Sequence, residues 1–252
     1  MTYLANPRHY ARDEFRTLVD GLSWSKGWRP SFPTLHNTGV PSLAQWIAYG
    51  ATTEERWGAN LNRYYQGLGW HSGPHLVCCP DYIWNLCDLE QDGVSVSCWN
   101  HLTIGIEMVG DYRVGGDNAS QGDGAKVIDN AVWALAVLAH KLGWAIGDVQ
   151  TGVKGLHFHR ECTADHHACP GGLVDKSEII GRVVAVMTSL GATPAPPPVK
   201  PPLVAAAATS SPPTDPLGRR KWIQDRVGVT PDGEIGPQTE AAIAAFISKH
   251  MA

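Results

Sequence analysis

Residues 102–110 read LTIGIEMVG, an apolar run that contains a single acid, Glu107. A short run that is rich in apolar side chains and ends at a glycine indicates a strand buried on both faces. Such a strand belongs in the interior of a sheet that helices cover. The run therefore predicts an α/β fold. It also singles out Glu107, because a buried carboxylate without a partner is strongly unfavourable.

The segments around this run alternate between strand and helix patterns. Short strands are expected at SFPTLH (residues 31–36), HLVCC (75–79) and YIWNLC (82–87), the last two as a pair. Helices are expected within residues 41–50, 53–70, 129–144 and 174–191. In the third helix, Asp129 is the expected N-cap and Gly143 the C-terminal stop. This alternation predicts a sheet with helices packed on its faces.

A change in composition marks a domain boundary. Residues 193–217 read TPAPPPVKPPLVAAAATSSPPTDPL, which predicts a semi-extended linker without a core. Residues 1–192 are then one domain, and residues 218–252 form a small module with a helix–loop–helix pattern. A module of this size supports little core of its own, so an accessory binding role is expected rather than catalysis.

Charge and hydropathy exclude several classes of protein. The net charge of the 252 residues is −4, and no basic block is present, so binding to nucleic acid is not expected. No apolar run reaches the roughly 20 residues that span a bilayer, so membrane insertion is not expected. The N-terminal residues lack a signal-peptide pattern, which predicts synthesis in the cytoplasm. In that reducing compartment, the six cysteines are expected to be thiols or metal ligands rather than disulfides.

Residues 157–172, HFHRECTADHHACPGG, contain four histidines and two cysteines. His157 and His159 are two residues apart, so on a strand they would share a face. Cys169 precedes a rigid Pro-Gly-Gly turn, and imidazole with thiolate is a typical zinc donor set. His36, which ends an extended apolar segment, is a candidate for a third ligand. These residues indicate a metal site, and the alternative is that they are ordinary surface or core side chains.

Four motifs occur in a recognisable order. They are LHNTG (residues 35–39), GPHLV (73–77), TIGIEMVGDY (103–112) and HFHRECTADHHACPGG (157–172). The ordered set resembles the zinc N-acetylmuramoyl-L-alanine amidases, which include phage endolysins and bacterial amidases, and the related peptidoglycan recognition proteins. The resemblance extends over about residues 30–190. It implies a central mixed β-sheet flanked by helices, one Zn²⁺ and a peptidoglycan substrate.

The resemblance also implies roles for individual residues. It implies that His36 and Cys169 are the first and third zinc ligands. The second is expected with seven to nine residues between it and the third. This selects His159, with nine residues between, and leaves His157, with eleven, as a neighbour. Glu107 corresponds to the catalytic glutamate, which acts as a general base and then as an acid.

Two positions depart from the family pattern. Many members have a lysine two residues before the last ligand, where this chain has His167, which becomes a candidate for stabilising the oxyanion. Many members also have a tyrosine at the position of Pro74. The adjacent His75 either takes over part of the role of that tyrosine or is structural.

The C-terminal module carries a resemblance of its own. Residues 229–246, VTPDGEIGPQTEAAIAAF, resemble the peptidoglycan-binding domain attached to many cell-wall hydrolases. The alternative is a helical oligomerisation tail. The ten tryptophans could stack on sugar rings, but core packing is expected for most of them.

Together these features predict a modular zinc amidase that cuts the bond between N-acetylmuramic acid and L-alanine. A wall-directed chain without a signal peptide suggests a phage endolysin, which reaches the wall after the host membrane is permeabilised. Three alternatives remain open. They are a recognition protein that binds peptidoglycan without cutting it, a zinc peptidase that cuts within the stem peptide, and a structural zinc clip.

Overall fold

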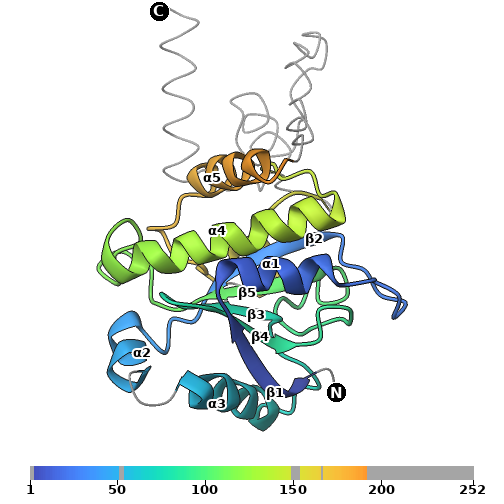
Figure 1. The fold of residues 1–252 in the computed structure, drawn as a ribbon. Helices are drawn as coiled ribbons and strands as arrows, with labels where there is room; N and C mark the ends of the chain where they lie inside the picture. Colours follow the sequence, from blue (N-terminus) through green and yellow to red (C-terminus); the bar gives the residue numbers. More distant parts are fainter. Residues whose placement is uncertain (1–2, 51–53, 149–153, 166, 192–252) are drawn as a thin grey trace, which may run out of the picture. The chain divides into compact units, whose positions relative to one another are not determined.

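A mixed sheet lies at the centre of the part of the chain that the computed structural model describes, which comprises residues 3–50, 54–148, 154–165 and 167–191 (Figure 1). Within these residues the sheet has six strands in the order β1-β4-β3-β5-β2-β6. The strands are β1 (Tyr3–Tyr10), β2 (Phe32–Asn37), β3 (Leu76–Cys78), β4 (Ile83–Cys87), β5 (Thr103–Met108) and β6 (His157–Phe158).

The strand with the LTIGIEMVG sequence occupies the interior of the sheet. β5 pairs in parallel with β3 on one side and with β2 on the other, and β2 pairs in parallel with β6. β4 runs antiparallel to both β3 and β1. Every residue of β5 except Glu107 is buried. The predicted α/β fold with a central mixed sheet is therefore confirmed.

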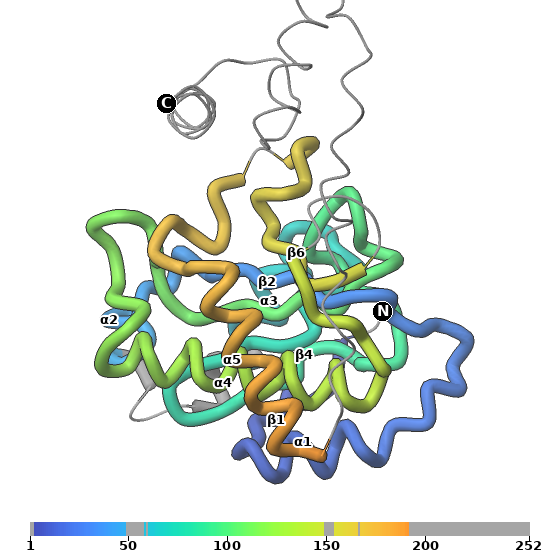
Figure 2. Tube along the Cα trace, turned by 90° about the horizontal axis from the view of Figure 1, so that it is seen from above, coloured from blue at the N-terminus to red at the C-terminus, as the bar shows by residue number. Residues whose placement is uncertain are grey.

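Helices cover both faces of the sheet. They are α1 (Arg12–Asp20), α2 (Leu43–Gly50), α3 (Glu54–Gly67), α4 (Gly122–Leu142) and α5 (Lys176–Ser189), with a 3₁₀ turn, η1, at His159–Glu161. Figure 1 shows α4 on one face and α3 on the other. α1 and α5 pack against α4, and Figure 2 shows α5 lying over it. α4 is buried between the sheet and these two helices, which explains its run of alanine, valine and leucine.

The predicted helices are present, but α4 begins earlier than expected. Its first residue is Gly122 and its N-cap is Gln121, so the prediction of Asp129 as the N-cap is wrong. Asp129 instead lies on the surface of α4 and forms ion pairs with Arg12 and Arg182. The start at Gly122 was not predicted because Gly124 disfavours a helix. A glycine is nevertheless required at position 124 by the close approach of the backbone. A Cβ at this position would overlap the carbonyl oxygen of Asn118.

Two other helix ends follow the sequence signals. Gly143 ends α4 in the left-handed conformation, with φ 69°, and its N–H donates to the carbonyl of Ala139. Asp175 caps α5 by accepting a hydrogen bond from the backbone N–H of Glu178.

One pair of cysteines departs from the prediction. Cys98 and Cys162 form a disulfide with an S–S distance of 2.06 Å, so the expectation of thiols is wrong for this pair. The two residues are 64 positions apart, and only the fold brings their loops together. Cys78, Cys79, Cys87 and Cys169 form no disulfide in the structure.

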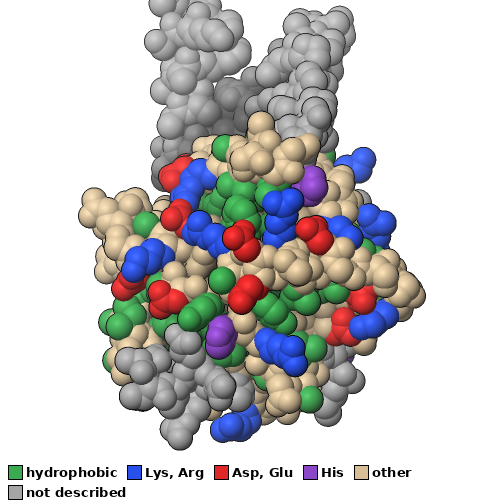
Figure 3. Space-filling view, in the orientation of Figure 1, with side chains coloured by type: hydrophobic (Ala, Val, Ile, Leu, Met, Phe, Trp, Pro, Cys, Tyr) green, Lys and Arg blue, Asp and Glu red, His purple; other side chains and the backbone are tan. Residues whose placement is uncertain are grey.

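The charge on the visible surface is mixed. Figure 3 shows acidic and basic side chains interspersed over the face formed by α1, α4 and α5, as the small net charge predicts. Among the described residues, no helix is both long and apolar enough to cross a membrane. The expected linker (193–217) and C-terminal module (218–252) lie outside the described residues.

Candidate functional site

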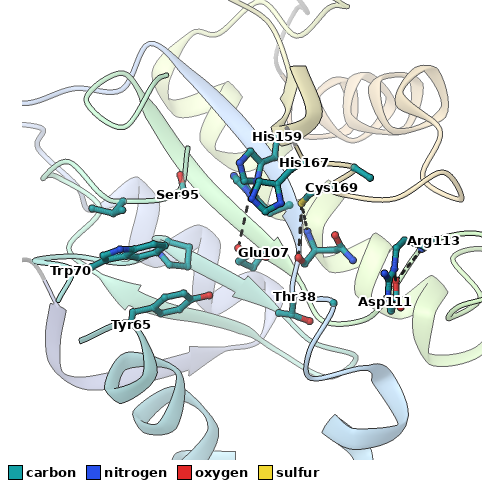
Figure 4. Close-up of a pocket in the computed structure, with 16 residues that line it drawn as sticks. Thr38, Tyr65, Trp70, Ser95, Glu107, Asp111, Arg113, His159, His167 and Cys169 are labelled. Atoms are coloured by element: carbon teal, nitrogen blue, oxygen red, sulfur yellow. Dashed lines mark hydrogen bonds and ion pairs between the residues drawn. The ribbon is translucent and has the colours of Figure 1, made fainter. Parts of the chain in front are cut away.

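Three residues that are far apart in the sequence meet at one edge of the sheet. His36 lies on β2, His159 begins η1 directly after β6, and Cys169 lies in the loop before α5. Figure 4 shows His159 and Cys169 close together above Glu107. One donor atom from each residue lies within 4.8 Å of the other two. The pairing of β2 with β6 brings His159 to His36, and the two Nδ1 atoms are 3.1 Å apart. The structure thus brings together the three predicted ligands.

The hydrogen bonds of His159 determine which of its ring nitrogens is free. Nε2 lies 3.0 Å from Oδ2 of Asp165, and a carboxylate only accepts, so Nε2 carries the proton. Nδ1 then presents its lone pair to Nδ1 of His36. Burial lowers the pKa of both histidines, and their mutual proximity adds to the effect for His36. Two neutral imidazoles whose nitrogens face each other at this distance suit a shared cation.

Cys169 completes a donor set that zinc prefers. Its Sγ accepts a hydrogen bond from the backbone N–H of Asn37 at 3.1 Å, a contact that favours a thiolate. Burial, followed by the nearby Glu107, raises the pKa of the thiol, so a thiolate here requires a compensating positive charge. Two imidazole nitrogens and one thiolate fit a zinc site with a fourth position left for substrate or water. The residues present therefore fit Zn²⁺.

Glu107 lies beside this cluster on β5. Its Oε1 is 4.0 Å from Nδ1 of His36, and the side chain is 13% exposed. Within the described part of the chain, the buried Oε2 has no hydrogen-bond partner. Burial raises the pKa of Glu107 to about 8. A carboxylate with a pKa in this range can exchange a proton with substrate or water near neutral pH.

The remaining histidines take different positions. His167 lines the same cavity, and its ring stacks on that of His159 with centroids 4.4 Å apart. His157 is buried elsewhere, against Phe32 and Trp99, and its Nδ1 contacts Glu161. His157 and His159 do not share a strand face, because β6 ends at Phe158 and the chain turns into η1.

His75 is structural. Its Nδ1 accepts a hydrogen bond from the backbone N–H of Gly105 at 3.2 Å, and its Nε2 donates to the carbonyl of Gln91 at 2.9 Å. Its ring stacks on Trp28 with centroids 5.5 Å apart. His75 therefore anchors β3 to its neighbours, and it does not line the cavity at the candidate ligands.

The cavity at the candidate ligands is lined by further residues that the sequence did not mark as functional. It has a volume of about 390 Å³, and Figure 4 shows Tyr65 and Trp70 on one side of the cluster and Asp111 and Arg113 on the other. Tyr65, on α3, stacks on Trp70 with ring centroids 5.5 Å apart. Trp70 is 36% exposed, whereas Trp84 is buried, as expected for a core tryptophan. Nothing in the sequence pattern of α3 distinguishes Tyr65 from a core residue.

Comparison with known proteins gives a family. The family model described as N-acetylmuramoyl-L-alanine amidase matches residues 26–172, which include all the candidate site residues. The chain belongs to this family. No curated protein matches the chain.

Several solved structures are similar. An endolysin amidase from Clostridium intestinale is 14% identical, with a TM-score of 0.44, and the match covers 62% of this chain and 84% of that one. A mutant endolysin from Bacillus subtilis is 20% identical, with a TM-score of 0.42 and coverages of 62% and 86%. Drosophila PGRP-LB is 17% identical, with a TM-score of 0.45 and coverages of 63% and 81%.

Proposed function

We propose that this member of the amidase family is a zinc-dependent peptidoglycan hydrolase. Its substrate would be the amide between the lactyl group of N-acetylmuramic acid and the L-alanine of the stem peptide. The observation that carries the proposal is the convergence of His36, His159 and Cys169 beside the buried carboxyl group of Glu107. A carboxylate next to a three-ligand site is the arrangement that metal-assisted amide hydrolysis requires.

Each residue has a distinct task in this proposal. His36, His159 and Cys169 would hold one Zn²⁺, which, when bound, polarises the scissile carbonyl and lowers the pKa of the attacking water. Glu107 takes the proton from this water and returns it to the departing amine of L-alanine. Burial raises the pKa of Glu107, which helps the side chain hold the proton between the two steps.

His167 is the proposed donor to the developing oxyanion. It is exposed, lines the cavity and stacks on His159, which places an imidazole beside the candidate metal site. An imidazole N–H that points at the carbonyl oxygen would stabilise negative charge in the transition state. His167 would then take the part for which many relatives use a lysine.

The test is to identify the bond that is cut. Purified protein is incubated with peptidoglycan, and the soluble products are identified by mass spectrometry. Free stem peptides that begin at L-alanine would support the proposal. Binding to the wall without any cut would indicate a recognition protein, and cuts within the stem would indicate a peptidase. Zinc that is bound without activity and is needed for folding would indicate a structural clip.

The remaining parts of the chain extend the proposal. Residues 218–252 would hold the enzyme on the wall through the linker at 193–217, raising the local concentration of the catalytic domain at an insoluble substrate. The biological role would be host lysis by a phage endolysin that is made in the cytoplasm and released to the wall. Loss of co-sedimentation with purified walls after deletion of residues 218–252 is the expected result for the module. Unchanged co-sedimentation would contradict the binding role.

A further inference from the structure

The carboxylate of Asp165 joins the candidate ligand His159 to a second loop. Its Oδ2 accepts a hydrogen bond from Nε2 of His159 and another from the backbone N–H of Ser97, each at 3.0 Å. Its Oδ1 accepts from the hydroxyl of Ser97. Ser97 therefore binds both oxygens of Asp165 and holds the carboxylate against His159.

The disulfide lies directly beside these contacts. Cys98 follows Ser97 in the sequence, and Cys162 lies midway between His159 and Asp165. The backbone N–H of Cys162 donates to the carbonyl of His159 at 2.9 Å, and that of Asp165 donates to the carbonyl of Cys162 at 3.1 Å. The disulfide thus ties the loop that carries Ser97 to the turn that carries His159 and Asp165.

The contact with Asp165 decides which ring nitrogen of His159 carries the proton. A metal can bind only at the nitrogen that does not. While Asp165 accepts the proton of Nε2, the lone pair of His159 stays on Nδ1, the nitrogen that faces His36. If Asp165 moves away, the proton is free to occupy Nδ1, and this tautomer cannot bind a metal at that atom. Among the described residues, Nε2 of His36 has no hydrogen-bond partner. Of these two histidines, His159 is the one that has a carboxylate at hydrogen-bonding distance, because Oε1 of Glu107 lies 4.0 Å from Nδ1 of His36.

We propose that Asp165 is a positioning residue for His159, and that the Cys98–Cys162 disulfide makes the zinc affinity of the site depend on redox state. The inference rests on the proposed zinc site. The oxidised chain holds Ser97 against Asp165 and binds zinc tightly. Reduction frees the two loops from each other, weakens the hold on Asp165 and lowers the zinc affinity. The site would then reach full affinity only in an oxidising compartment.

The redox step balances with a dithiol as the reductant. A thiolate of the dithiol attacks the sulfur of Cys98, which belongs to an exposed residue, and Cys162 leaves as a thiolate. The second thiolate of the dithiol then displaces Cys98, and the reductant closes its own disulfide. Two electrons and two protons pass from the dithiol to the two cysteines. Oxidation reverses these steps with a disulfide as the acceptor.

The test measures zinc affinity in both redox states of the full chain. The protein is reduced with a dithiol, the reductant is removed without air, and the dissociation constant for zinc is measured by competition with a chromogenic chelator. Counting thiols after denaturation verifies the states, because four of the six cysteines are outside the disulfide and reduction exposes all six. We expect zinc binding to weaken about 10- to 100-fold on reduction, the range typical for loss of a residue that orients a ligand.

Variants separate positioning from general loosening of the fold. Asp165→Asn should weaken zinc binding in the oxidised protein by a similar factor, and reduction should then have little further effect. Asp92→Asn is the matched control. Its carboxylate contacts Nδ1 of the exposed His101 at 2.6 Å, and it should leave both the affinity and its response to reduction unchanged. Cys98→Ser/Cys162→Ser should behave like the reduced chain and should not respond to the dithiol.

The outcomes distinguish this inference from the proposed function. Equal zinc affinity in the oxidised and reduced chain would overturn the redox inference and leave the zinc amidase proposal standing. An Asp165→Asn protein that still responds fully to reduction would overturn the role of Asp165. If the double cysteine variant does not fold, the zinc affinities of the reduced wild-type protein and of the Ser97→Ala variant test the inference. An affinity equal to that of the oxidised wild type in both proteins would overturn it. Absence of zinc binding in every state would overturn the proposed function itself.

Discussion

His36 and Glu107 are register partners on the adjacent parallel strands β2 and β5, and His36 Nδ1 lies 4.0 Å from Glu107 Oε1. Each residue is the last but one of its strand, so both side chains lie at the carboxyl edge of the sheet. Ligand sites of open α/β sheets commonly occupy this edge. Because the pair is fixed by sheet hydrogen bonds, the proposed metal ligand and the proposed base cannot drift apart as loop residues can.

Glu107→Gln should lower kcat by about 100- to 10,000-fold, because the amide cannot accept the proton of the attacking water. The substitution keeps the size of the side chain, and Glu107 is not among the proposed ligands, so zinc content should stay at one ion per chain. Turnover of a soluble muramyl peptide and zinc content by elemental analysis are the measurements. Near-normal turnover would remove Glu107 from the mechanism.

The assignment of His159 rather than His157 as the ligand can be tested directly. His159→Ala should abolish stoichiometric zinc binding, because it removes the Nδ1 that faces His36. His157→Gln should keep zinc and lose stability, because His157 is buried against Phe32 and binds Glu161. Zinc content and thermal unfolding report the two effects separately. The reverse pattern would show that the ligand assignment is wrong.

His75 should make the stability of the protein fall with acidification. Burial lowers its pKa to about 4 from an ordinary value of 6.5, so the folded protein keeps His75 neutral while the unfolded chain takes up a proton. The contribution of neutral His75 to the free energy of unfolding is complete above pH 6.5 and is lost progressively between pH 6.5 and pH 4. Compared with a His75→Gln protein, the wild type should lose about 2 kcal/mol of unfolding free energy between pH 7 and pH 5.

The comparison of these two proteins by urea unfolding at several pH values is the measurement. Other titrating groups are present in both proteins, so they cancel in the difference. A difference between the two proteins that does not change with pH would show that His75 titrates normally in the folded state.

Trp70 should contribute to substrate binding rather than to the chemical step. It is partly exposed on the cavity wall and stacks on Tyr65, a position suited to contact with a substrate. Trp70→Ala should raise KM by about 2- to 10-fold and leave zinc affinity unchanged. Trp133→Phe is the control, because Trp133 lies on α4 and donates to the carbonyl of Arg12. A fall in kcat at constant KM would contradict the binding role.

Strands β2 to β5 and part of the candidate site could be predicted because they follow from local patterns, whereas β1 and α1 were not predicted. The run at residues 102–110 has the composition of an interior strand, and a lone acid within it stands out. Cys169 and His159 lie in one short segment, where the density of donor residues is itself a signal. His36 could be named as a candidate from its place at the end of an extended apolar segment, but its approach to His159 could not be predicted locally, since it depends on the pairing of β2 with β6.

The disulfide, the cavity wall at Tyr65 and the role of Asp165 could not be predicted, because they depend on contacts between segments that no local pattern encodes. The Cys98–Cys162 disulfide joins loops 64 positions apart, and the expectation of a reducing compartment argued against it. Tyr65 reaches the cavity because α3 packs on the sheet at β1 and β4, although the helix pattern alone gives no reason to separate it from the core. The role of Asp165 is equally invisible in the sequence, because it arises from contacts with Ser97 and His159.

The most direct test of the central claim is metal-dependent cleavage of a soluble N-acetylmuramoyl peptide. The protein is stripped of metal with a chelator, assayed for release of peptide that begins at L-alanine, and assayed again after one equivalent of zinc is added. The account predicts no release from the stripped protein and recovery of release with zinc. Full activity of the stripped protein, or no activity in either state, would contradict it.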